Sequence, residues 1–136
     1  NYHIYGSPKY LEKHGFPKNT SDLNKHSFIS FGRGAPSPVY NPDWALKLGT
    51  KDNKKRKTVM KVNSVYGLLL AVQSGVGLAA LPDYITVNQP NIVKVLPNIE
   101  GPITEAHFVY PQSMKNVARV QAFRNFLYSK ISEWEF

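Results

Sequence analysis

The chain has 136 residues, a length that supports one compact core rather than two independent domains. It contains no cysteine, which excludes a disulfide scaffold, a cysteine-based zinc site and a thiol nucleophile. The formal net charge is +8, from 17 Lys plus Arg against 9 Asp plus Glu. No apolar run approaches the roughly 18 residues of a membrane-spanning helix, and the first residues lack the pattern of a signal peptide.

The N-terminal residues predict a strand followed by two short helices. Residues 2–6 (YHIYG) have the composition of a strand, so we expect the chain to start inside a larger protein. Ser7 is a suitable N-cap, Pro8 suits the first helical position, and Gly15 ends this first helix. A second short helix is predicted within residues 20–26.

The next segment predicts three strands. Ser27–Phe31 alternates polar and apolar residues like a half-buried strand, and glycines and prolines mark residues 32–42 as a loop, the most flexible part of the chain. Alternation at residues 44–48 and again at 58–63 predicts an antiparallel hairpin.

A basic loop would join the two strands of this hairpin. Five of the seven residues from 51 to 57 are Lys or Arg. A solvated loop is favoured over a nucleic-acid contact, because the segment has no aromatic side chain on which a base could stack.

The stretch Lys61–Asp83 (KVNSVYGLLLAVQSGVGLAALPD) predicts a β-α-β unit around which the chain is organised. A helix over Val65–Gln73 would begin at an Asn63 or Ser64 cap and end at Gly75. Its nearly continuous apolar surface predicts that it is covered on most sides.

The second strand of this unit is predicted at Val76–Leu81. Its apolar run is typical of a strand in a parallel sheet, where both faces are buried. Pro82 would end the strand, and Asp83 would cap a short helical turn over residues 84–87.

Ligands of open α/β sheets bind outside the carboxyl ends of the strands, and here that edge carries Asn63, Ser64, Val65 and Tyr66. Free N–H groups at the start of the helix are donors for an anion or a carboxylate. The alternative is that Ser64 only caps its helix and the crevice binds nothing.

The C-terminal part predicts two strands and a long helix. Ile92–Leu96 lies between prolines and suits an edge strand, and Ala106–Tyr110 is the last predicted strand. Ser113 would cap a final amphipathic helix, whose apolar positions recur every three or four residues. Its aromatic stripe, Phe123, Phe126 and Trp134, is expected to pack in a core, and part of it would be exposed if the chain is a fragment that lacks its neighbours.

The sequence gives no support for catalysis or for a cofactor. The four histidines show no metal-ligand spacing, and two of them, His14 and His26, fall at predicted helix ends. The sequence shows no paired catalytic carboxylates, no phosphate loop and no nucleophile elbow. Gly75 and Gly77 form only a G-x-G motif, which is too short to indicate a dinucleotide-binding site.

Three segments in order resemble the effector-binding domain of LysR-type transcriptional regulators. They are YGSPKYLEKHGFPKNTSDLNKHSFISF (residues 5–31), VNSVYGLLLAVQSGVGLAALPDYI (62–85) and HFVYPQSMKNVARVQAFRNFL (107–127). Each segment is built from common residue types, but their order and spacing together cover nearly the whole chain.

This resemblance implies an α/β fold of the type 2 periplasmic-binding-protein kind, a Rossmann-like mixed sheet flanked by helices, present here as a partial module. Residues 5–103 would form the second of two subdomains, and residues 104–136 would return to the first. A small effector, with a carboxylate as the candidate class, would bind in the cleft between the subdomains. The residues of this chain expected to line the cleft are Ser30, Phe31, Gly32, Asn63, Ser64 and Tyr66.

The resemblance also implies partners and a location. We expect a cytoplasmic bacterial regulator that forms a homodimer or homotetramer, contacts DNA only through an N-terminal domain outside this chain, has no membrane contact and performs no catalysis. The main alternative is a solute-binding protein of a transport system, which shares the fold and would carry a signal peptide. An α/β enzyme and a basic nucleic-acid-binding module rank behind it.

Overall fold

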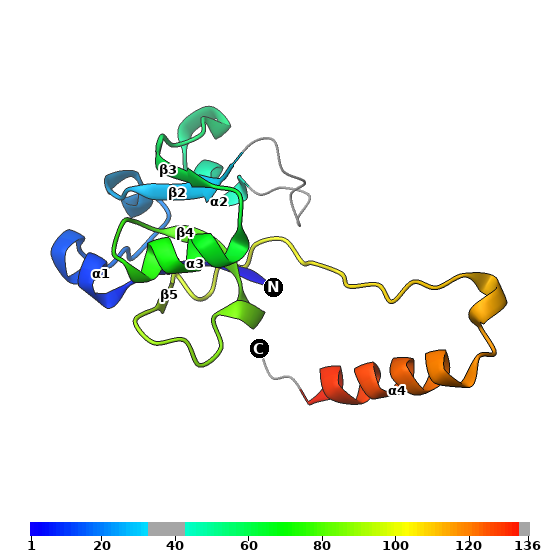
Figure 1. The fold of residues 1–136 in the computed structure, drawn as a ribbon. Helices are drawn as coiled ribbons and strands as arrows, with labels where there is room; N and C mark the ends of the chain where they lie inside the picture. Colours follow the sequence, from blue (N-terminus) through cyan, green and yellow to red (C-terminus); the bar gives the residue numbers. More distant parts are fainter. Residues whose placement is uncertain (33–42, 134–136) are drawn as a thin grey trace. The chain divides into compact units, whose positions relative to one another are not determined.

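The computed structural model describes residues 1–32 and 43–133, and the chain divides into two compact units after Thr104. The strands of unit 1 are β1 (Tyr2–Gly6), β2 (Phe28–Phe31), β3 (Thr58–Val62), β4 (Ala79–Pro82) and β5 (Val93–Val95). Its helices are α1 (Pro8–His14), α2 (Trp44–Lys47) and α3 (Val65–Gln73), with the 3₁₀ turns η1 (Asp22–Lys25), η2 (Lys51–Asn53) and η3 (Asp83–Ile85). Unit 2 contains the turn η4 (Gln112–Met114) and the helix α4 (Ala118–Ser132) (Figure 1).

Unit 1 is built on a mixed sheet. Strand β1 lies between β4 and β5 and runs antiparallel to both, while β2 and β3 form a parallel pair. A parallel bridge between Phe28 and Leu78 joins the two sheets, with Ile29 N–H donating to the Leu78 carbonyl at 2.8 Å and Leu78 N–H donating to the Ser27 carbonyl at 2.9 Å. The predicted α/β fold with a mixed sheet is therefore confirmed.

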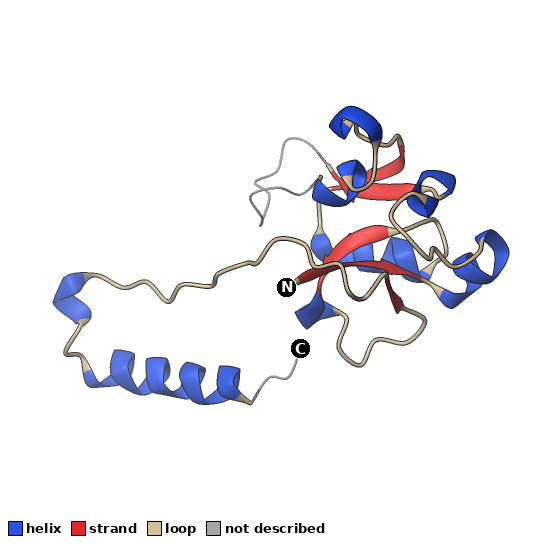
Figure 2. Ribbon diagram, turned by 180° about the vertical axis from the view of Figure 1, so that it is seen from behind, coloured by secondary structure: helices blue, strands red, loops and turns tan. Residues whose placement is uncertain are grey.

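Helices cover both faces of this sheet (Figure 2). Successive strand residues point to opposite faces, so Ile4 and Phe28 join one core cluster while Tyr5 and Ile29 join the other. The first cluster also contains Tyr10, Leu11, Leu23, Ala45, Leu46, Leu78 and Val95. The second contains Leu68, Leu69, Val72, Ala79 and Leu81. The two clusters give the layered order of helix, sheet and helix.

Helix α3 has the limits and the caps that the sequence predicts. The Ser64 hydroxyl accepts from Gly67 N–H at 3.2 Å. At the other end Gly75 has a φ of +79°, and its N–H donates to the Val72 carbonyl while Val76 N–H donates to the Ala71 carbonyl. This is the Schellman pattern, in which a glycine takes the left-handed conformation without a side-chain clash.

Several elements of the N-terminal half also match their predictions. Strand β1 and helix α1 have the expected limits, and the Ser7 hydroxyl accepts from Tyr10 N–H. The second short helix is the 3₁₀ turn η1, and β5 lies at the sheet edge as expected. Strand β2 is present, but it is not half-buried, because Phe28, Ile29 and Ser30 are all buried.

The predicted hairpin between residues 44 and 63 is wrong. Residues 44–47 form helix α2, and β3 pairs with β2 in parallel instead of with a strand at 44–48. Parallel strands need a crossover connection of a dozen residues or more, which the long segment between β2 and β3 supplies. The predicted loop of residues 33–42 lies outside the described residues.

The β-α-β unit differs from its prediction at the second strand. Strand β4 spans Ala79–Pro82 rather than residues 76–81, and it pairs antiparallel with β1, so that only Leu78 makes the expected parallel contact. The expectation that α3 is covered on most sides is also wrong. Leu68, Leu69 and Val72 are buried, but Leu70 is 47% exposed.

In unit 2 the long helix is present without its predicted surroundings. Residues 106–110 form no strand, and Ser113 lies within η4 and caps no helix. Helix α4 follows Val117, which makes no side-chain cap. None of its described side chains is buried, and Phe123 and Phe126 are about half exposed, contrary to the expectation of core packing; Trp134 lies outside the described residues.

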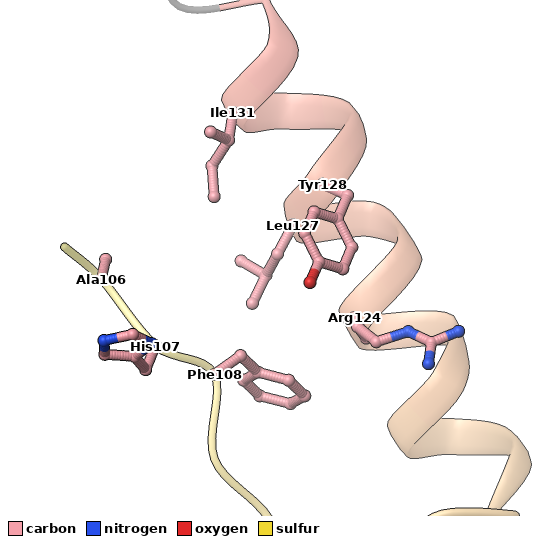
Figure 3. A pocket seen from close by; sticks show the side chains of 7 residues that line it. All are labelled: Ala106, His107, Phe108, Arg124, Leu127, Tyr128 and Ile131. Carbon is pink, nitrogen blue, oxygen red and sulfur yellow. The ribbon is translucent and has the colours of Figure 1, made fainter.

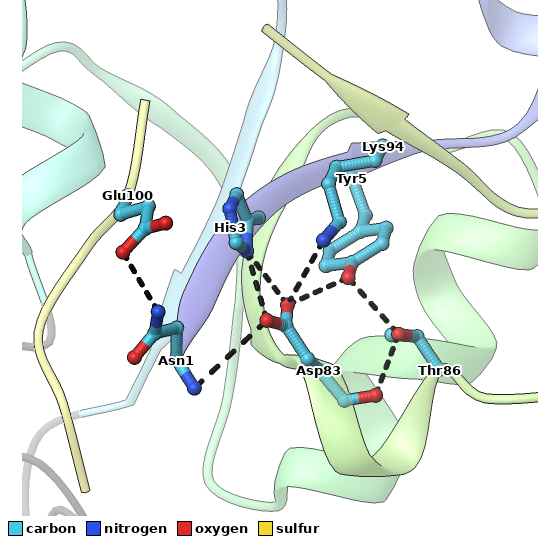
Figure 4. A network of polar contacts seen from close by, with 7 residues as sticks. All are labelled: Asn1, His3, Tyr5, Asp83, Thr86, Lys94 and Glu100. Carbon is cyan, nitrogen blue, oxygen red and sulfur yellow. Dashed lines mark hydrogen bonds and ion pairs between the residues drawn. The ribbon is translucent and has the colours of Figure 1, made fainter. Parts of the chain in front are cut away.

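Asp83 does not cap a turn; its carboxylate is the centre of a buried polar network (Figure 4). His3 Nδ1 lies 2.8 Å from Oδ1 and carries the proton, because an ionised carboxylate only accepts. The Tyr5 hydroxyl donates to the same oxygen at 2.7 Å, and Lys94 Nζ lies 3.8 Å away. Burial raises the pKa of Tyr5 well above its usual range, so the phenol remains a donor. The network ties β1 to the end of β4.

We predict that Asp83→Ala lowers the free energy of unfolding by about 3 kcal/mol, because it leaves the buried donors of His3 and Tyr5 without their acceptor. Urea denaturation followed by circular dichroism measures this change. Glu12→Ala, which removes an exposed carboxylate from α1, is the control and should change the value by less than about 0.5 kcal/mol. Equal effects of the two substitutions would contradict a stabilising role for the network.

Candidate effector-binding site

The candidate crevice lies where the parallel strands β2 and β3 end together. Phe31 pairs with Val62, and the N–H of Gly32 donates to the Val62 carbonyl at 2.9 Å. A Cβ on Gly32 would lie 3.6 Å from the Cβ of Asn63, so these two residues are neighbours across the strand ends. Ser64 follows directly and begins α3. The structure thus brings Gly32, Asn63 and Ser64 to one edge.

This edge offers hydrogen-bond donors. The Ser64 oxygen accepts from Gly67 N–H, which leaves the hydroxyl hydrogen available to a ligand. The first backbone hydrogen bond within the helix runs from Leu68 N–H to the Ser64 carbonyl. The N–H groups of Val65 and Tyr66 come before this bond and have no acceptor within the helix. The partial positive charge at a helix start favours an anionic ligand group.

The two predicted aromatic walls differ in their packing. Phe31 is partly buried and packs against the cluster under α3 together with Val62. Tyr66 is 63% exposed, so its ring presents a large apolar surface next to the start of the helix. Phe31 is therefore held in place by the core, whereas Tyr66 lies in the first turn of α3 and is exposed.

Ser30 lines a cavity together with Phe31, and the lining of this cavity does not include Asn63, Ser64 or Tyr66. Ser30 pairs with Lys61 of β3, and its side chain lies on the opposite side of β2 from Phe31, as successive strand residues do. It is buried, with 7% exposed, and it lines a cavity on the side of α2. The assignment of all six residues to a ligand remains a prediction.

That cavity has a volume of about 100 Å³ and was not predicted. It is lined by Ser30, Phe31, Asp43, Leu46, Lys55, Arg56, Thr58 and Lys61. The sequence indicated the basic residues but placed them on a solvated hairpin loop. Their convergence on one cavity depends on the parallel pairing of β2 with β3, for which the local sequence carries no signal.

Unit 2 has a groove of its own, with a volume of about 210 Å³ (Figure 3). The extended segment Ala106–Phe108 forms one wall, and Arg124, Leu127, Tyr128 and Ile131 of α4 form the other. The ring of Phe108 packs edge-on against Phe123 with centroids 5.6 Å apart. The groove is mainly apolar, and the apolar side chains around it remain partly exposed.

No group of three His, Asp or Glu side chains in the described part of the chain could hold a metal ion. Within the same residues, no helix is long and apolar enough to cross a membrane.

A family model for the LysR substrate binding domain matches residues 1–131. The chain belongs to this family. An HTH-type transcriptional regulator from Haemophilus influenzae is 31% identical over 113 residues, which cover 80% of this chain and 38% of that protein. The chain therefore spans well under half the length of this relative.

Solved structures of LysR-type regulators share the fold. The regulatory domain of CrgA from Neisseria meningitidis matches with a TM-score of 0.70 and 23% identity, over 95% of this chain and 63% of that one. The effector domain of AmpR from Pseudomonas aeruginosa matches with a TM-score of 0.50 and 16% identity, over 93% and 58%. This LysR substrate-binding domain thus has the expected regulator fold, and the comparisons favour the regulator over the solute-binding protein.

Proposed function

We propose that this LysR-family chain is the effector-sensing part of a DNA-binding transcriptional regulator, and that its small ligand binds at the carboxyl ends of β2 and β3. The observation that carries the proposal is the meeting of Gly32, Asn63 and Ser64 at one edge beside the start of α3. Because the Ser64 hydroxyl and two helix N–H groups are donors there, a carboxylate is the ligand group that fits. The function is binding rather than catalysis.

The proposed mechanism is a shift between conformations. Residues 5–103 would act as the second subdomain, and residues 104–136 would return to the first, so that a ligand between the subdomains stabilises one relative orientation. In a cytoplasmic homodimer or homotetramer this preference would reach N-terminal DNA-binding domains. A ligand shifts such an equilibrium only by its difference in affinity for the two conformations.

The first test is to determine the coding DNA sequence upstream of Asn1. We expect a reading frame that encodes the rest of the first subdomain and a helix-turn-helix, because the chain spans 38% of the Haemophilus influenzae regulator. The encoded full-length protein should bind DNA from its own promoter region in a mobility-shift assay. A frame that opens with a signal peptide and contains no helix-turn-helix would contradict the regulator and favour a transport protein.

A second test addresses the crevice. We predict that Ser64→Gly in the full-length regulator weakens binding of a carboxylate effector about tenfold, because it removes one hydrogen bond to a charged group. Glycine is itself an acceptable N-cap, so the substitution should lower the stability of the helix by only about a few tenths of a kcal/mol. A panel of small mono- and dicarboxylates screened by thermal shift supplies the effector, and isothermal titration calorimetry measures its Kd.

The control for this test is Ser74→Gly, at the opposite end of the same helix. The Ser74 hydroxyl donates to the Leu70 carbonyl and lies away from the crevice. Its substitution should leave the Kd within twofold of the original value. A Ser64→Gly variant that binds the effector as tightly as the Ser74→Gly variant would rule out Ser64 as a ligand-binding residue.

The apolar side of unit 2 supports the proposed return to the first subdomain. We predict that Phe123→Ala lowers the free energy of unfolding of the full-length regulator by about 3 kcal/mol, as for an aromatic residue buried against the first subdomain. In the 136-residue chain the same change should remove only the contact with Phe108, a loss of about 1 kcal/mol. Chemical denaturation measures both values.

Asn125→Ala, an exposed change on the same helix, should shift both unfolding free energies by less than about 0.5 kcal/mol. If Phe123→Ala has the same small effect in both proteins, the apolar side of α4 does not pack against the first subdomain.

A further inference from the structure

The cavity between β2, β3 and α2 carries an excess of positive charge. Its lining contains the cations Lys55, Arg56 and Lys61 against the single carboxylate of Asp43. Lys55 Nζ pairs with the Asp43 carboxylate at 2.5 Å. This ion pair reduces the repulsion that the carboxylate would exert on a bound anion. Two cations, Arg56 and Lys61, therefore remain without a carboxylate partner within ion-pair distance in the described residues.

Three hydrogen bonds hold the guanidinium of Arg56 at this cavity. Its Nε donates to the Asn24 side-chain oxygen at 2.9 Å, and its two terminal nitrogens donate to the carbonyls of Ala45 at 3.1 Å and Thr20 at 3.2 Å. The guanidinium also lies 5.6 Å from the centre of the Phe28 ring. All of these partners are neutral, so the charge is fixed in place and not cancelled. Burial lowers the pKa of Arg56 from its ordinary value.

Strand register brings further polar groups to the same cavity. Ser30 and Lys61 are paired residues of β2 and β3, so their side chains lie on one face of the sheet. Thr58, at the start of β3, contributes a second hydroxyl to the lining. Hydroxyl groups and cations that converge on one small cavity are the donors that bind oxyanions.

We propose that this cavity is a binding site for a small inorganic oxyanion, phosphate or sulfate, held by Lys61, Thr58 and Ser30 in the field of Arg56. Its volume of about 100 Å³ is well below the 300–1,000 Å³ typical of pockets for larger organic ligands. The cavity shares Ser30 and Phe31 with the residues expected to line the effector cleft, so the two sites adjoin. The inference goes beyond the proposed effector function, because Thr58, Lys61 and Arg56 are not among those residues and the ligand is an inorganic oxyanion.

The test is isothermal titration calorimetry of the 136-residue chain with sodium phosphate at constant ionic strength, with sodium chloride as the reference titrant. We expect saturable binding of one phosphate per chain and none of chloride. Lys61→Gln should weaken phosphate binding about tenfold, since a hydrogen bond to a charged group is lost. Thr58→Val should weaken it in the same direction without a change of net charge.

Lys57→Gln is the matched control, because it removes one positive charge from the same segment at an exposed position outside the cavity lining. It should change the phosphate Kd less than twofold. Equal losses in Lys61→Gln and Lys57→Gln, or no saturable phosphate binding, would overturn the proposal. Ser64→Gly should leave phosphate binding unchanged. Loss of phosphate binding in that variant would place the anion in the effector crevice, which would overturn the separate site and leave the proposed function standing.

Discussion

Two backbone hydrogen bonds between Leu78 and the start of β2 hold the two small sheets of unit 1 together. Strands β2 and β3 alone form a two-stranded pair, which is marginally stable in water at best. The bridge at Leu78 attaches this pair to β4 and β1, and both core clusters then extend across the junction. The crevice and the oxyanion cavity both lie on the attached pair, so their geometry depends on that junction.

Local signals in the sequence predicted the elements that are stabilised locally. Ser64 and Gly75 mark the two ends of α3, and Ser7 with Pro8 marks the start of α1, because caps need particular residue types at particular positions. Pairing partners were harder to predict. Residues 44–48 alternate in the way strand residues do, but tertiary contacts of Ala45 and Leu46 with the core favour a short helix.

Asp83 illustrates the same limit for side chains. An aspartate after a proline at a strand end is a common helix cap, and the local sequence indicated that role. Its actual partners, His3 and Tyr5, lie 80 and 78 positions earlier and approach it only because β1 pairs with β4. The candidate site was predictable to a similar degree. Gly32 and Ser64 were placed at one edge from the resemblance and the β-α-β pattern, whereas the cavity beside Ser30 required the register of β2 with β3.

The central position of β1 has a consequence for synthesis on the ribosome. Of the strands of unit 1 this one is synthesised first, but its nearest pairing partners, Tyr5 and Ala79, are 74 positions apart, and its pairs with β5 are farther still. At translation rates of about 5–20 residues per second, β1 waits about 4 to 15 s before β4 is made. Throughout that interval the apolar residues of β1 have no strand to pair with in unit 1. The nascent chain is therefore a natural client for chaperones that bind extended apolar segments.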